Sequence, residues 1–328
     1  MKKLIAYLIA IAVIIYAGKT LFSAINCGGN SKRNTEISIK DNSVDTENTE
    51  EEKPKKPLFT ASENDATVGL GEEIDSDYVI LIDEQEGTII AEKNAHSRMV
   101  PASMTKVLTV LVAAEQIEEE DLDDVVTITF EATDYAYVND CSVTGFKKDE
   151  TVTVKDLFYG TILPSGGESA YQLALYSAGS IENFVELMNE KIDELGLSET
   201  SHFTNSVGIY DENLYTTPYD MAVIMQAAMD NDICREALTK HTYKTTATEQ
   251  SPEGITISNL FLRRIEDQEL GGATVLGGKT GFVNQSGNCA VSYAEGASKK
   301  TYICVTGSAS SGWQCIYDHA NLYATYAK

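Results

Sequence analysis

The sequence predicts one α+β domain whose antiparallel sheet is built from both ends of the folded part of the chain. Two strand-like segments come first, a largely helical block follows, and three further strand-like segments precede a final helix. With 328 residues, of which 43% are hydrophobic, the chain has ample apolar material for a packed core. We expect this domain to occupy residues 76–328.

Two segments before the domain are predicted to have other roles. Residues 1–28 start with two lysines and continue with an apolar run from Leu4 to Ala17, which is typical of an export signal. The apolar residues after this run extend it to the length of a membrane anchor, so cleavage and retention both stay open. The positive start predicts that the rest of the chain lies outside the cytoplasm, in the cell envelope or secreted. Residues 29–75 are acidic and polar, which predicts a flexible linker.

The elements of the domain follow from the period of the apolar residues and from the turn residues between them. Strands are predicted at Tyr78–Ile82, Thr88–Glu92, Val125–Phe130, Thr274–Val283, Gly287–Ala294 and Tyr302–Thr306. Helices are predicted from Pro101, after Val152–Lys155, from Glu168, and at Ile181–Leu195, Pro218–Met229 and Gln314–Tyr326. An irregular stretch is expected from Asn139 to Gly145, and a loop at Ser165.

Charge and cysteine spacing exclude several classes of function. The 25 basic and 50 acidic residues give a net charge of -25, which argues against a nucleic-acid partner held through its phosphates. The six cysteines have no Cys-x-x-Cys spacing, and the four histidines have no metal-ligand spacing. We therefore expect neither a zinc cage nor a metallopeptidase.

The segment Pro101-Ala102-Ser103-Met104-Thr105-Lys106 places a hydroxyl and an amine three residues apart at a predicted helix start. Side chains at this spacing lie on the same face of a helix. Apolar residues at helical spacing predict that the helix is buried along one stripe, namely Met104, Val107, Leu108, Leu111 and Val112. Since burial lowers the pKa of a lysine, a neutral Lys106 amine is predicted to take the Ser103 proton and make the hydroxyl a nucleophile.

Two further motifs turn this pair into a specific pattern. Ser165 lies in the loop Leu163-Pro164-Ser165-Gly166-Gly167, and Lys279 lies on the strand segment Gly277-Gly278-Lys279-Thr280-Gly281. Glycines in a strand allow close approach of a ligand backbone, while Lys279 and Thr280 offer a charge and a hydroxyl to a carboxylate. The three motifs follow one another at separations of 62 and 114 residues, as in serine acyltransferases that bind penicillin.

On these motifs the chain resembles the serine-type D-alanyl-D-alanine carboxypeptidases, the low-molecular-mass penicillin-binding proteins of the peptidase S11 type. The resemblance covers roughly Tyr78 to Thr306 and includes the segments Met188–Gly208 and Tyr215–Met221. It implies a β-lactamase/transpeptidase-like fold, an acyl-enzyme mechanism on peptidoglycan stem peptides, binding of β-lactam antibiotics, and no need for a cofactor or metal.

The resemblance also implies roles for individual residues. Ser103 attacks the carbonyl between two terminal D-alanines, Lys106 takes its proton, and Ser165 relays a proton to the leaving amine. The N–H groups of Ser103 and Phe282 then stabilise the oxyanion, a preorganised pair of the kind that supports acyl transfer.

On the substrate-binding strand, the resemblance assigns the terminal carboxylate to Lys279 and Thr280, with Gly281 beside them.

Gly167 departs from the family pattern, which has asparagine at this position. Either another side chain supplies the missing amide, or the enzyme is slower, or the domain binds without turnover. We favour activity because the other motifs are intact.

One alternative function is that of a class A-like β-lactamase. Such an enzyme needs a further glutamate with an asparagine four residues later, and no glutamate between Ser165 and Lys279 has an asparagine at that spacing. A catalytically impaired penicillin-binding wall receptor is the other alternative.

Overall fold

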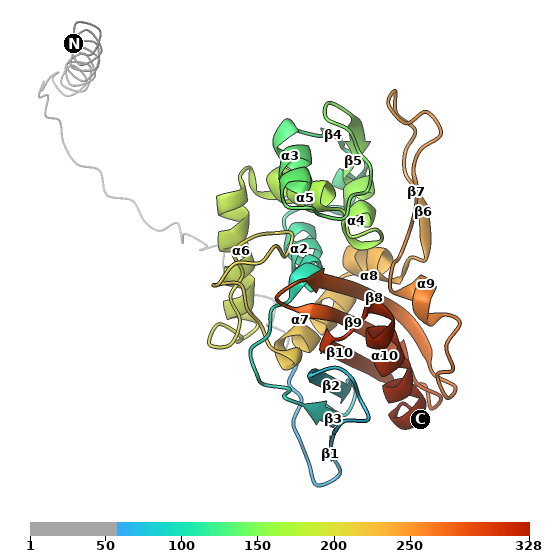
Figure 1. Cartoon of the computed structure of the whole chain (residues 1–328). Coiled ribbons are helices and arrows are strands. Elements are labelled where there is room, and N and C mark those ends of the chain that lie inside the picture. The colour runs from blue at the N-terminus through green and yellow to red at the C-terminus, as the bar shows by residue number, and fades with distance from the viewer. Residues whose placement is uncertain (1–57) are drawn as a thin grey trace, which may run out of the picture. The chain divides into compact units, whose positions relative to one another are not determined.

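The computed structural model describes residues 58–328, and a six-stranded sheet forms the centre of this part of the chain (Figure 1). The strand order is β1-β3-β2-β10-β9-β8, and every neighbouring pair is antiparallel except β1 and β3. The strands are β1 (Val68–Gly69), β2 (Tyr78–Asp83), β3 (Thr88–Lys93), β8 (Thr274–Val283), β9 (Gly287–Glu295) and β10 (Thr301–Ala309). The predicted sheet from both ends of the chain is therefore confirmed, and β8 forms one of its edges.

Strand β1 lies within the range that the sequence predicted as a linker. It pairs with β3, the Leu70 N–H donates to Glu92 O over 2.9 Å, and Ile74 is 3% exposed. Residues 58–75 therefore pack against the sheet, and the prediction of a linker is wrong for them, because a few apolar residues and backbone hydrogen bonds anchor them. The signal or anchor predicted at residues 1–28 and the linker predicted at residues 29–57 lie outside the described residues.

Both faces of the sheet are covered by helices, and the sequence of β2 shows why. Successive side chains of a strand point to opposite faces. Ile80 and Ile82 enter the core on the face of α7 (Pro218–Asp230), whereas Val79 and Leu81 enter the core on the face of α10 (Gly312–Tyr326). A strand buried on both faces reads as a continuous apolar run, which is what this segment shows.

The remaining helices form the block between β3 and β8. They are η1 (Ala102–Met104), α2 (Thr105–Ala114), η2 (Glu119–Asp123), α3 (Phe130–Val138), α4 (Val154–Ile162), α5 (Gly167–Ala178), α6 (Ile181–Glu194), α8 (Asp232–Thr239) and α9 (Leu262–Ile265). Two short hairpins accompany them, β4 (Val125–Thr127) with β5 (Thr151–Thr153), and β6 (Thr242–Lys244) with β7 (Thr256–Ser258). Within residues 58–328, no helix has the length and apolar character needed to cross a bilayer.

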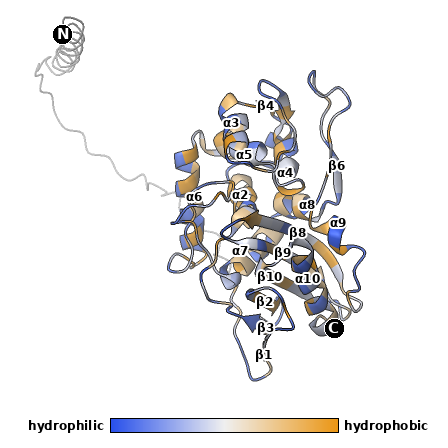
Figure 2. Cartoon of the chain, in the orientation of Figure 1, coloured by the Kyte–Doolittle hydropathy of each residue, from blue (hydrophilic) through white to orange (hydrophobic). Residues whose placement is uncertain are grey.

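Helix α2 is buried on every side, whereas the sequence predicted burial along one stripe. All ten of its residues are buried, including Lys106 and Thr109. Lys106 and Thr109 find partners in the segment around residue 207: Lys106 Nζ donates to Val207 O and Thr109 Oγ1 to Ser206 O, each over 2.7 Å. By contrast, α6 alternates between apolar and polar residues around its surface (Figure 2), as an amphipathic helix with one exposed face does.

Some elements depart from the sequence prediction. Val125–Phe130 was predicted as one strand, but β4 ends at Thr127 and α3 begins at Phe130, capped by Thr129, whose side chain accepts from the Ala132 N–H. The apolar side chains Phe130, Tyr137 and Val138 of α3 are exposed, so the helix lacks the apolar period that would have identified it.

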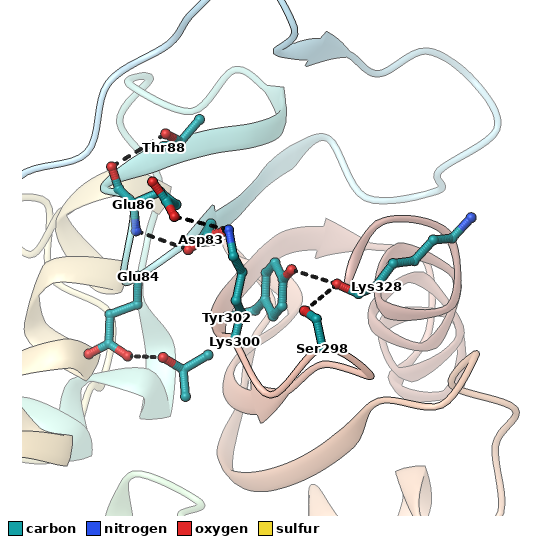
Figure 3. Close-up of polar contacts among 9 residues, drawn as sticks. Asp83, Glu84, Glu86, Thr88, Ser298, Lys300, Tyr302 and Lys328 are labelled. Carbon is teal, nitrogen blue, oxygen red and sulfur yellow. Dashed lines mark hydrogen bonds and ion pairs between the residues drawn. The ribbon is translucent and has the colours of Figure 1, made fainter.

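A polar cluster closes the end of the sheet at the turn between β9 and β10 (Figure 3). Lys300 Nζ lies 2.9 Å from Asp83 Oδ2 and 3.2 Å from Glu86 Oε1. Tyr302 Oη and Ser298 Oγ donate to the backbone carbonyl of Lys328 at 3.4 and 2.5 Å. These contacts tie the last residue of the chain to the sheet.

Candidate active site

Ser103 and Lys106 lie side by side, as the sequence predicted. Lys106 Nζ is 3.0 Å from Ser103 Oγ and donates to Val207 O over 2.7 Å. Ala102, directly before the serine, has φ +46°, a conformation that costs energy for a residue with a side chain. Gly208 has φ +89°, and a Cβ there would overlap the Ala102 carbonyl, so only glycine allows this approach.

Burial gives the Lys106 amine the properties of a base. The side chain is 1% exposed, and removal from water lowers the pKa of Lys106 to about 8, although Cys141 and Glu168 act in the opposite direction. About a tenth of the amine is therefore uncharged at pH 7. An uncharged amine 3.0 Å from the hydroxyl can accept its proton.

Ser165 and Lys279 form a second hydroxyl–amine pair. Ser165 has φ +66° and lies in the loop between α4 and α5. Lys279 Nζ donates to Ser165 Oγ over 2.8 Å and to Thr280 O over 2.6 Å. Burial, followed by the neighbouring Lys106, lowers the pKa of Lys279 well below its usual range. The three motifs therefore meet in space, as their order in the chain predicted.

A cavity of about 530 Å³ opens over these groups. Its lining includes Ser103, Lys106 and Ser165 from the helical side and Thr280, Gly281 and Phe282 from β8. Lys279 is 1% exposed and does not belong to the lining; its amine lies behind Ser165.

The edge strand β8 approaches Ser103 closely. A Cβ on Gly281 would lie 3.0 Å from Ser103 N and 3.1 Å from Pro101 O, so glycine lets the strand reach the helix that carries Ser103. Phe282 follows and is 58% exposed. The predicted oxyanion donors, the N–H groups of Ser103 and Phe282, thus belong to two segments that are in contact.

Gly167 has a physical reason to be glycine. A Cβ built at this position would lie 2.6 Å from Cys141 Cβ and 3.0 Å from Cys141 Sγ. The Gly167 N–H also donates to Ser142 O over 2.8 Å. The loop at residues 139–142 therefore fills the space that a side chain at 167 would need, and Cys141 lines the cavity in its place.

Glu168, the next residue, holds the backbone at Gly145, just after this loop, and does not line the cavity. It is 1% exposed, and its Oε1 accepts from the Gly145 N–H over 2.8 Å. Among the described residues its Oε2 has no hydrogen-bond partner, and burial raises the pKa of the Glu168 carboxyl.

Sequence reasoning missed Cys141, Arg264 and Trp313, all of which line the cavity. Arg264 belongs to the four-residue helix α9, which is too short to show a period, and Cys141 lies in a stretch that the sequence left irregular. Their positions depend on tertiary contacts, and no local pattern marks them.

Comparison with known proteins agrees with this geometry. The family described as D-alanyl-D-alanine carboxypeptidase, Peptidase S11, matches residues 61–310. The D-alanyl-D-alanine carboxypeptidase DacF of Bacillus subtilis is 28% identical over 254 residues, which is 77% of this chain and 62% of DacF. DacC of Escherichia coli, of the same description, is 35% identical over 158 residues, 47% of this chain and 39% of DacC. The chain thus spans less than two thirds of the length of these curated relatives.

Solved structures share the fold. The crystal structure of the Streptomyces K15 DD-transpeptidase superposes with a TM-score of 0.67 at 28% identity, covering 77% of this chain and 97% of that one. The D-alanyl-D-alanine carboxypeptidase DacD of Francisella tularensis gives 0.63 at 25% identity, covering 76% and 70%. The predicted β-lactamase/transpeptidase-like fold is therefore confirmed. The chain belongs to the D-alanyl-D-alanine carboxypeptidase family, Peptidase S11.

Proposed function

We propose that the chain is a serine D-Ala-D-Ala carboxypeptidase that trims the terminal D-alanine of peptidoglycan stem peptides and is acylated by β-lactams. The observation that carries this proposal is the contact of 3.0 Å between Ser103 Oγ and the buried Lys106 amine, at the floor of a cavity that Ser165 also lines. The family match and the names of the relatives support the same reaction and do not favour a class A-like β-lactamase.

The acylation half of the reaction uses the two hydroxyl–amine pairs in turn. Uncharged Lys106 accepts the Ser103 proton while Oγ attacks the carbonyl carbon of the penultimate D-alanine. The carbonyl oxygen becomes an oxyanion, which the N–H groups of Ser103 and Phe282 stabilise. The C–N bond then breaks, and Lys106 passes its proton through the Ser165 hydroxyl to the departing amine. Lys106 is then uncharged again, and the shortened peptide remains as an ester on Ser103.

Deacylation returns the enzyme to its starting state. A water molecule loses a proton to the Lys106 amine as it attacks the ester carbonyl, and the proton returns to Ser103 Oγ when the ester bond breaks. Lys279 acts in both halves through its hydrogen bond to Ser165, which keeps that hydroxyl in place. Gly167 and Gly281 contribute space, since a Cβ on either would meet Cys141 or the Ser103 backbone.

The proposal includes the place of action. Residues 1–28 act as a signal or a membrane anchor, residues 29–57 act as an acidic linker, and the catalytic domain that follows works outside the cytoplasm on the cell wall. The length of the mature protein, from its measured N-terminal residue, tests this part: a start near residue 29 indicates cleavage, and an intact N-terminus in the membrane fraction indicates an anchor.

A peptide-release assay tests the enzymatic proposal. The wild-type protein is expected to release D-alanine from a pentapeptide that ends in D-Ala-D-Ala and to carry fluorescent penicillin on Ser103. Ser103→Ala is expected to lose both. Persistent penicillin labelling without D-alanine release would point to a wall receptor, rapid antibiotic hydrolysis to a β-lactamase, and continued D-alanine release by Ser103→Ala would overturn the assignment of the nucleophile.

A further inference from the structure

Asn259 is a buried amide whose donors and acceptor are all in use. It follows β7 directly and is 1% exposed. Its Nδ2 donates to Leu238 O over 3.3 Å and to Gly278 O over 3.2 Å. Its Oδ1 accepts from the N–H groups of Phe261 and Leu262 over 2.9 and 3.1 Å. A buried polar side chain with every bond satisfied rigidifies the segments that it joins.

One of these segments is β8, at the residue directly before Lys279. In the described sheet β8 is an edge strand that pairs with β9. The hydrogen bond from Asn259 holds Gly278 O, and the Phe261 ring packs on the same glycine, because a Cβ there would come within 2.5 Å of the ring. Both contacts fix the backbone from which the Lys279 side chain starts.

Leu260, the residue after Asn259, holds the loop that carries Ser165. The Leu260 N–H donates to Leu163 O over 3.1 Å, at the end of α4. Ser165 lies two residues further on with φ +66°, a conformation that persists only where the surrounding structure enforces it. Two consecutive residues therefore hold the backbone beside Lys279 and the backbone beside Ser165.

The contact between Ser165 and Lys279 depends on these two attachments. Lys279 Nζ donates to Ser165 Oγ over 2.8 Å, although the two residues are 114 positions apart in the chain. A shift of about 1 Å in either backbone would take this contact outside the range of a hydrogen bond. The Ser165 hydroxyl would then lose the donor that orients it.

We propose that Asn259 is a positioning residue for proton transfer to the leaving group. By fixing β8 against the adjoining loop, it keeps the Lys279 amine on the Ser165 hydroxyl, which passes the proton from Lys106 to the departing amine. Asn259 itself does not line the cavity, so it acts through these residues and not on the substrate. The attack by Ser103 needs Lys106 but does not need this alignment. The inference rests on the proposed function and names a residue that supports its second proton transfer.

Two substrates separate this transfer from the rest of acylation. One is a peptide that ends in D-Ala-D-Ala, whose leaving amine must take a proton as the C–N bond breaks. The other is the matching thiolester, in which sulfur replaces the nitrogen of the last D-alanine. Since a thiol has a pKa of about 8.5, the sulfur departs as a thiolate that needs no proton, and Lys106 then returns its proton to solvent. The kcat/KM of each substrate reports the steps up to loss of the leaving group.

Asn259→Ser is the test variant. Its hydroxyl can still accept from the N–H groups two and three residues later, but the two N–H donors are lost. Its kcat/KM for the peptide is expected to fall about 10- to 100-fold, as displacement of a reacting group by about 1 Å predicts, while kcat/KM for the thiolester stays within about threefold of wild type. Asn259→Gln, which keeps the amide but moves it by one methylene, is expected to give a smaller loss with the same preference. Activity on the thiolester also shows that each variant is folded.

Asn205→Ser is the matched control. The Asn205 side chain likewise holds backbone, since its Oδ1 accepts from the N–H groups of Val207 and Gly208 over 3.2 and 2.7 Å. This turn, however, carries the carbonyl that contacts the Lys106 amine. Because both substrates need Lys106 as the base for attack, Asn205→Ser is expected to lose about the same factor on the peptide and on the thiolester.

A double-mutant cycle tests whether Asn259 acts through Ser165. In Ser165→Ala protein, the added Asn259→Ser is expected to change kcat/KM for the peptide by less than about threefold, and a further loss as large as that in the wild-type background would overturn the inference. Equal losses of Asn259→Ser on peptide and thiolester would assign Asn259 a purely structural role, and an unchanged peptide rate would also overturn the inference. A failure of the proposed function looks different, because the wild-type protein would then cleave neither substrate.

Discussion

Lys300 and Lys106 carry the same ammonium group in opposite surroundings. Lys300, at the far end of the sheet, contacts two carboxylates, Asp83 and Glu86 (Figure 3), and its hydrogen bonds to them raise the pKa of its amine. Lys106 is enclosed, its amine donates to the Ser103 hydroxyl and the Val207 carbonyl, and burial lowers its pKa to about 8. Paired with carboxylates, a lysine stays charged; buried beside a hydroxyl, it becomes available as a base.

This availability has a thermodynamic cost. The folded-state pKa of Lys106 lies below its value of 10.5 in the unfolded chain, so the folded protein binds fewer protons between these two values. Burial of the charge therefore destabilises the fold below pH 8, by about 3 kcal/mol, and this cost is relieved as the pH rises from about 8 to 10.5. The packed cores on the two faces of the sheet stabilise the fold and offset this destabilisation.

Replacing each lysine by methionine tests the comparison, and Lys106→Met gives the largest expected effect on the acylation rate. Lys106→Met removes the base from Ser103, so the rate of acylation by fluorescent penicillin is expected to fall about 1,000-fold. Tm is expected not to fall, because relief of the buried charge offsets the lost hydrogen bond to Val207. Stopped-flow or gel labelling and a thermal melt measure the two quantities.

Lys300→Met is the matched control. Its acylation rate is expected to equal that of wild type, and Tm is expected to fall by about 2 to 4 °C, because the buried Asp83 carboxylate loses its cation. An acylation rate in Lys106→Met within tenfold of wild type would exclude Lys106 as the base.

The next largest effect on the acylation rate is expected from a substitution of Gly167, because this residue packs against Cys141 in the wall of the cavity. In Gly167→Asn, the new Cβ lies 2.6 Å from Cys141 Cβ, which is fixed to the loop backbone, so the loop must move and displace the groups around Lys106. Displacement of about 1 Å at a reacting centre costs about 100-fold in rate, and we expect a loss of this size in acylation. Cys141→Gly combined with Gly167→Asn reopens the space. The acylation rate of this double variant is expected to be at least about tenfold higher than that of Gly167→Asn alone.

Gly179→Asn, at the other end of α5, is the control: it makes the same glycine-to-asparagine change at a position where the side chain meets no neighbour. Gly179 has φ +77°, which asparagine tolerates, and a Cβ there would have no atom within 4 Å. This variant is expected to acylate like wild type. If Gly167→Asn matched or exceeded wild type, the missing amide would be a real deficit and the loop would not be built around glycine.

The parts of the site that the sequence predicts are those that follow from spacing. Ser103 and Lys106 meet because a helix repeats every three to four residues. The remaining motif residues were expected beside them because the three motifs together identify a family, and the fold of that family brings the motifs to one site. The faces of β8 are not predictable in this way: strand alternation separates Lys279 from Thr280, but only the contact of Lys279 with Ser165 shows which of the two residues faces the helices.

Tertiary contacts determine the rest. The burial of α2 on all sides depends on the helices around it, and Thr109 looks like a surface residue until Ser206 O is placed against it. Arg264 and Cys141 reach the cavity from a one-turn helix and a loop, where neither helical nor strand period exists. These features require coordinates, because the sequence signal for them is not local.

The pH dependence of acylation is the smallest of the expected effects and tests the comparison most directly. If uncharged Lys106 is the base, the acylation rate follows the fraction of deprotonated amine, which rises with pH through the pKa of about 8. The rate under non-saturating penicillin is expected to increase about tenfold from pH 7 to pH 9 and then level off. Lys300→Met must show the same inflection, since the Lys300 amine does not contact the cleft. A rate that is flat or falls over this range would mean that the charged form of Lys106 is the working one, and the role of the two lysines in the comparison would no longer differ.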